Sequence, residues 1–140
     1  MPPKVPTVAQ VMAEANNARQ QLAALDQQLQ DGIDDIDFKV FKEKRPPTAA
    51  ETSKRKDLRS TQGEVRAQFA VLAFVTAKRL DDTDEVSQLV RQMNTINAGL
   101  KDDLDRLKRI EKYAAIAAKV ADATAKATEK LAAIAAKGLS

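Results

Sequence analysis

The chain has 140 residues, enough for one domain with a hydrophobic core, and it contains neither cysteine nor histidine. These two absences exclude disulfides, thiolate ligands, and the commonest general base and metal ligand. The 23 basic and 20 acidic residues leave a net charge of +3, which is too balanced to indicate nucleic-acid binding without a local basic cluster.

Helix-forming residues dominate the composition, whereas aromatic residues make up 4% and only four glycines occur. We therefore predict an all-α protein, an elongated antiparallel three-helix bundle or coiled coil, with a four-helix bundle as the alternative. The first ten residues lack a signal-peptide core, and the longest nearly uncharged run before the C-terminus, 67–77, is 11 residues. A membrane-spanning helix needs ~20 residues. We expect no signal peptide or transmembrane helix and a cytoplasmic location, although a specialised export system would leave no such mark.

Three capping boxes mark where helices begin. In each box a Thr or Asp side chain accepts from an orphan backbone N–H, and a Gln or Glu three residues later reaches back. The predicted helices are residues 8–45, 48–80 and 83–137, and the prolines at 46–47 form the tip of the first hairpin. The residue pairs that form the three capping boxes are Thr7 with Gln10, Thr48 with Glu51, and Asp82 with Glu85.

Apolar residues recur every three or four positions through the first predicted helix. This spacing gives one apolar seam along its length, as in coiled-coil packing. The seam consists of Val8, Val11, Ala15, Ala18, Leu22, Leu25, Leu29, Ile33, Ile36 and Val40.

The second predicted helix has two unlike halves. Residues 48–64 are polar with Leu58 as their one large apolar residue, whereas 69–75 are apolar around most of the helix. A chain reversal at 46–47 would set Leu29 near Val65 and Leu25 near Phe69. The half nearest the turn is thinly packed, so we expect it to be the more mobile end.

The third predicted helix, 83–137, is much longer than its neighbour. Its 55 residues would extend ~82 Å, against ~48 Å for the second helix. A break at Gly99, giving a fourth helix, is the alternative to a continuous helix. If the helix is continuous, residues from 114 onward have no partner within the chain and protrude.

This C-terminal segment is rich in alanine. Alanine occupies 12 of the 24 positions in 114–137, and the sequence AAIAAK occurs at both 114–119 and 132–137. Alanine needs no burial, so the segment could be a solvated helix. We instead favour a bulky stripe beside an uncharged small-residue face that contacts a neighbour. The candidate interface is Ala114, Ile116, Ala117, Ala118, Val120, Ala121, Ala125, Leu131, Ile134 and Ala135.

Basic residues cluster on both sides of the predicted hairpin tip. Seven of them occur in 42–59, against three acidic residues, and the turn brings them together. No aromatic residue lies between Phe41 and Phe69 to stack on bases. The candidate basic tip is Lys42, Lys44, Arg45, Lys54, Arg55, Lys56 and Arg59.

These patterns favour a non-enzymatic structural or protein-interaction module. The expected partner is a second copy of the chain, bound through the alanine-rich helix, or another protein. One alternative is an amphipathic protein acting at a membrane surface or forming a pore; another is sequence-indifferent nucleic-acid binding at the basic tip, which is disfavoured. No nucleophile has a base beside it, so we expect no enzyme activity, cofactor, metal or small-molecule substrate.

Overall fold

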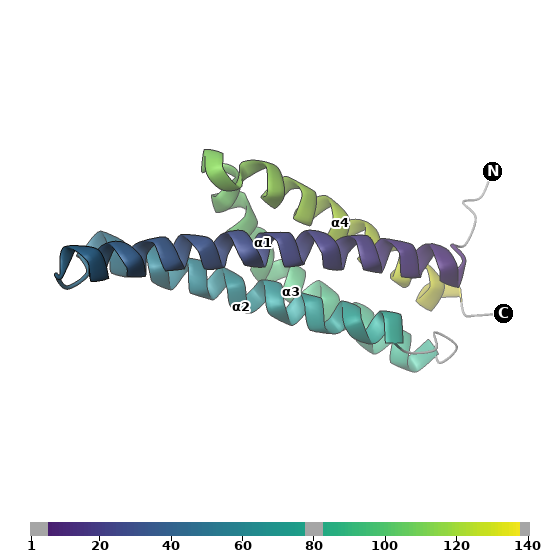
Figure 1. The fold of residues 1–140 in the computed structure, drawn as a ribbon. Helices are drawn as coiled ribbons and strands as arrows, with labels where there is room; N and C mark the ends of the chain where they lie inside the picture. Colours follow the sequence, from purple (N-terminus) through teal and green to yellow (C-terminus); the bar gives the residue numbers. More distant parts are fainter. Residues whose placement is uncertain (1–5, 78–82, 138–140) are drawn as a thin grey trace.

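A computed structural model describes residues 6–77 and 83–137, and within these ranges the chain forms four α-helices and no strand (Figure 1). Successive helices run in opposite directions. α1 packs against α2 and α4, and α3 packs against the same two helices, which closes a four-helix bundle. The all-α bundle is confirmed, with four helices rather than three. The helices are α1 (Val8–Glu43), α2 (Ala49–Ala77), α3 (Thr83–Lys108) and α4 (Glu111–Lys137).

Two of the three predicted capping boxes are confirmed. Thr7 Oγ1 accepts from the N–H of Gln10 at 3.1 Å, and Gln10 Oε1 accepts from the N–H of Thr7 at 2.9 Å. Thr48 and Glu51 make the same reciprocal pair at 3.1 and 3.0 Å. Each pair satisfies N–H groups that the helix leaves free. Asp82 lies outside the described residues.

α1 ends two residues earlier than predicted, at a left-handed residue. Lys44 has φ 50° and ψ 45°, and its N–H donates to the carbonyl of Phe41 at 3.2 Å. The N–H of Arg45 donates to the carbonyl of Val40 at 3.4 Å. Together these bonds form a Schellman-type helix end. The chain therefore turns before Pro46 and Pro47, and both prolines lie in the loop that leads to α2.

The register between α1 and α2 agrees with the predicted pairing. The Arg66 guanidinium donates to Asp26 at 3.0 Å, and the Gln62 amide donates to Gln30 at 2.9 Å. Both bonds cross between helices at positions adjacent to the predicted Leu29–Val65 pair.

The prediction of one continuous helix over 83–137 is wrong, and so is the alternative break at Gly99. α3 runs through Gly99 and ends at Lys108. The N–H groups of Arg109 and Ile110 then make short i→i−3 bonds, at 3.2 and 3.0 Å. The Ile110 carbonyl accepts the first bonds of α4. No glycine or proline lies at this break, so local sequence gives no stop signal there.

Packing on α1 accounts for the break. The bulky stripe of α4, which includes Val120, Leu131 and Ile134, is buried. Burying each large side chain contributes ~1.5–3 kcal/mol, more than the ~0.5–1.5 kcal/mol lost with each backbone hydrogen bond at the turn. Ion pairs flank the contact, including Lys130 with Glu14 at 3.3 Å. The predicted protrusion of 114–137 is therefore wrong, because α4 folds back along its own chain (Figure 1).

A chain of polar side chains crosses the interior between α2, α3 and α4. Gln68, which is fully buried, donates to the Asn97 side-chain oxygen. The Asn97 amide donates to Thr128 Oγ1 at 3.0 Å, and that hydroxyl donates to the Thr124 carbonyl at 2.7 Å. Buried polar groups require such partners, so these bonds favour one register of the three helices.

The α1–α2 hairpin extends past the α3–α4 turn, at the left of Figure 1. The last buried residue of α1 is Ile36 and the first of α2 is Leu58. Every residue between them, 37–57, is exposed or half-buried. We call residues 37–57 the arm. Because α3 and α4 reach only the base of the arm, near Ser53 and Asp57, most of it is a two-helix projection outside the main core (Figure 1).

Candidate functional site

The predicted interface on the C-terminal helix is largely inside the molecule. Of its ten residues, five are buried, three are half-buried, and only Ala118 and Ala125 are exposed. The buried residues cannot contact another chain while the bundle is folded, so this part of the predicted interface is corrected. The sequence pattern identified a real packing face, but α1 and α3 cover it. The five buried residues are Ile116, Ala117, Val120, Leu131 and Ile134.

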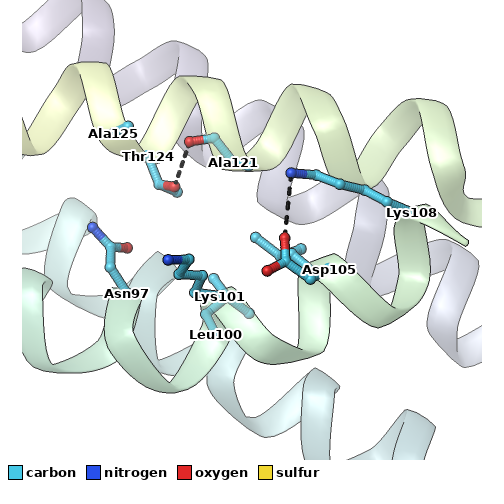
Figure 2. Close-up of a pocket in the computed structure, with 9 residues that line it drawn as sticks. Asn97, Leu100, Lys101, Asp105, Lys108, Ala121, Thr124 and Ala125 are labelled. Carbon is cyan, nitrogen blue, oxygen red and sulfur yellow. Dashed lines mark hydrogen bonds and ion pairs between the residues drawn. The ribbon is translucent and has the colours of Figure 1, made fainter.

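Two of the remaining alanines, Ala121 and Ala125, border a cleft of about 270 Å³ between α3 and α4 (Figure 2). The cleft exists because the small side chains of α4 do not fill the space between the two helices. At one end Lys108 pairs with Asp105 at 3.6 Å, and the Thr124 hydroxyl already donates to the Val120 carbonyl at 2.8 Å. Asp105, Lys108 and Thr124 therefore have partners within the chain, and the charged side chain of Lys101 lines the cleft as well (Figure 2). Its lining residues are Asn97, Leu100, Lys101, Leu104, Asp105, Lys108, Ala121, Thr124 and Ala125.

The seven residues of the predicted basic tip lie together on and beside the arm, but two of them are engaged by acids. The Arg45 guanidinium binds both Glu51 oxygens, at 2.7 and 3.0 Å, and also pairs with Glu43. Arg55 binds both oxygens of Asp37, at 2.8 and 3.1 Å. These paired arginines hold the two helices of the arm and their connecting loop together. The exposed remainder is Lys42, Lys44, Lys54, Lys56 and Arg59.

These contacts lower the pKa of both carboxyl groups. Hydrogen bonds from Arg45 and then from the Thr48 backbone lower the pKa of Glu51 to about 2 from 4.5. The hydrogen bond from Arg55 likewise lowers the pKa of Asp37. Both carboxylates are charged at neutral pH, so the arm keeps its cross-links there.

Acidification is expected to loosen the arm before it unfolds the bundle. Because the folded-state pKa of Glu51 is depressed, its contribution to stability is present above pH 4.5 and is lost as the pH falls toward 2. After correction for the slower intrinsic exchange of amides in acid, hydrogen exchange should then accelerate at Glu51 and Thr52, while amides near Leu25 stay protected. Glu51→Gln should show the fast exchange already at pH 6. Equal exchange in both proteins across this range would contradict the assigned role of the carboxylate.

The sequence analysis missed two exposed phenylalanines on the arm. Phe38 is 64% exposed and Phe41 is 79% exposed. At ~100° per residue, they lie three residues apart on the face of α1 opposite the Ile36 and Val40 seam. Because Phe38 and Phe41 lie outside the apolar seam, the spacing in the sequence indicates that they are exposed.

The arm also carries the charge imbalance of the chain. It holds seven basic and four acidic residues, an excess of three, which equals the net charge of the whole sequence. The remaining residues are therefore balanced overall. Positive potential and exposed aromatic surface coincide at this one end of the molecule.

Comparison of the chain with protein-family models, curated proteins and solved structures finds no match. Within residues 6–77 and 83–137, no helix is long and apolar enough to cross a bilayer. Across the same ranges, no three acidic side chains gather closely enough to hold a metal ion.

Proposed function

We propose that this chain is a non-enzymatic protein-interaction module that makes its contacts through the arm. The observation that supports this most is the pair Phe38 and Phe41, exposed on adjacent turns of a projecting helix. Single exposed apolar residues are ordinary, whereas a cluster on a projection is typical of a binding surface. Aromatic residues are also enriched at the centres of protein interfaces.

The fold supports the arm over the C-terminal helix as the contact surface. Self-assembly through 114–137 depended on a bulky stripe without a partner, and residues such as Leu131 and Ile134 are buried within the chain. The same burial weakens the membrane alternative, because an interfacial helix needs its apolar stripe free to enter lipid.

Nucleic-acid binding at the arm has less support than protein binding. Arg45 and Arg55, the two arginines within the arm, are bound by its own carboxylates and are poorly placed to neutralise phosphates. Asp31 and Asp34 are exposed on the same side of α1 as the phenylalanines. A phosphate backbone lying along this side would meet those carboxylates.

Site-specific photocrosslinking tests the proposal. Benzoylphenylalanine placed at position 41 of the full chain, in the cells that naturally produce it, should give one discrete adduct whose partner mass spectrometry identifies. Phe74, which is 57% exposed but lies on α2 outside the arm, is the matched control position. The adduct should disappear when Phe38→Ser is added. Failure to form it at 41, or the same adduct from 74, would contradict the arm as the contact surface.

A further inference from the structure

Charges along the outer face of α1 follow an ordered sequence toward the tip. Asp31 and Asp34 come first, then Phe38 and Phe41, then Lys42. At ~100° per residue these five positions fall within a sector of about 120°, centred opposite the buried seam. All five are exposed. One continuous strip therefore runs from acidic through aromatic to basic.

From this order we infer that the arm binds a second copy of the same chain, in an antiparallel pair of α1 helices. This inference rests on the proposed function, since it names the partner of the same surface. A two-fold axis passing near the phenylalanines would reverse the strip in the second copy. The acidic end of each strip would then lie opposite the basic end of the other.

The positions match residue by residue. With the axis at Phe38, Asp34 lies four residues before it and Lys42 lies four residues after it. Asp34 of one copy would therefore face Lys42 of the other, and the two Phe38 rings would meet at the centre.

The strip itself is free for such a pairing, because α2 and α4 contact α1 on either side of it. α2 approaches α1 on one flank, where Arg55 binds Asp37, and α4 approaches on the other, where Lys112 lies 3.6 Å from Asp35. The strip lies between these flanks. Because the hairpin extends past the α3–α4 turn (Figure 1), an antiparallel pair would direct the rest of each bundle away from the other copy's tip.

The strip suits this partner better than a uniformly anionic one. Asp31 and Asp34 hold intrahelical hydrogen bonds from Gln27 and Gln30, each at 2.9 Å, and stand exposed beside the rings. A phosphatidylserine surface or a nucleic acid would gain at the basic end and be repelled at this acidic end. A second strip in reverse order meets both ends with opposite charge.

The expected dimer is weak and sensitive to salt. An overlap of residues 31–45 is ~21 Å long, which is short for an interface covering the ~800 Å² per partner of a standard stable complex. Exposed ion pairs are screened over ~10 Å at 0.1 M salt. The dimer should therefore form reversibly at high concentration and weaken as the salt is raised.

Charge-swapped variants of the full chain test the inference by analytical ultracentrifugation between roughly 10 µM and 1 mM. The acid-reversed variant is Asp31→Lys with Asp34→Lys, and the base-reversed variant is Lys42→Glu with Lys44→Glu. Each alone places like charges opposite each other and should weaken the dimer at least about tenfold. An equimolar mixture restores opposite signs at both ends and should recover the dimer as a heterodimer.

Three further measurements accompany the swap. Asp102→Lys with Lys119→Glu reverses exposed charges on α3 and α4 and should leave association unchanged. Thermal melts should confirm that every variant is folded, and Phe38→Ser with Phe41→Ser should be monomeric throughout.

A wild-type chain that stays monomeric at about 1 mM in low salt would overturn the inference, as would a mixture that fails to recover association. Binding of monomers to phosphatidylserine vesicles or to an oligonucleotide, without any dimer, would overturn it too. If the purified chain stays monomeric while position 41 still crosslinks to another protein in cells, self-pairing fails and the proposed function stands.

Discussion

Replacing Leu131 with alanine should lower the free energy of unfolding by about 2–5 kcal/mol. Leu131 lies on α4 and is fully buried, so truncation removes apolar contacts and leaves a cavity that the neighbouring helices fill only partly. A domain of this size has a total stability of ~5–15 kcal/mol. The loss should therefore be plain in urea denaturation followed by circular dichroism.

The matched control is Phe41→Ala, which truncates a larger side chain on the arm. Phe41 is mostly exposed, so we expect its truncation to change stability by no more than ~0.5 kcal/mol. Both variants should be measured at a low concentration, where association does not contribute. If Leu131→Ala were as mild as Phe41→Ala, α4 would not be part of the core.

Replacing Gly32 with alanine should destabilise the protein by about 1–3 kcal/mol, against the usual preference of helices for alanine. A Cβ at Gly32 would lie 2.4 Å from the Tyr113 hydroxyl oxygen and 3.2 Å from a Leu58 methyl carbon. Tyr113 is buried, so its ring has to shift within packed surroundings. The missing side chain thus lets α1, α2 and α4 approach at the base of the arm.

Two further variants distinguish this clash from other effects of the Gly32→Ala substitution. Tyr113→Phe removes the clashing oxygen, and the next ring carbon is 3.7 Å from the new Cβ, so the double variant should recover most of the loss. Gly63→Ala has nothing within 4 Å and should raise stability by about 0.5–1 kcal/mol. Stabilisation by Gly32→Ala in thermal or urea melts would contradict the close approach.

The helices up to the arm could be predicted because their signals are local. The capping boxes at Thr7 and Thr48 satisfy backbone groups within the same helix turn, and the apolar seam of α1 shows its buried face at regular spacing. Proline chemistry identified the hairpin turn in the same way. These features do not depend on residues distant in the sequence.

The break at Arg109 and Ile110 could not be predicted, because no residue there stops a helix. It depends on α4 meeting α1, a contact between residues more than 100 positions apart, such as Glu14 and Lys130. A straight helix over 83–137 would have left the uncovered surface at the C-terminus. Most of the arm is uncovered instead, since α3 and α4 end near its base (Figure 1).

The chain covers its C-terminal helix and leaves most of its arm uncovered. Native-state amide hydrogen exchange on the monomer compares the two directly. We predict that amides of α4 between Val120 and Leu131 are protected as strongly as those of α1 between Leu22 and Leu29, while amides in 38–55 exchange fastest among the helices. Rapid exchange in α4 together with strong protection of the arm would contradict the account.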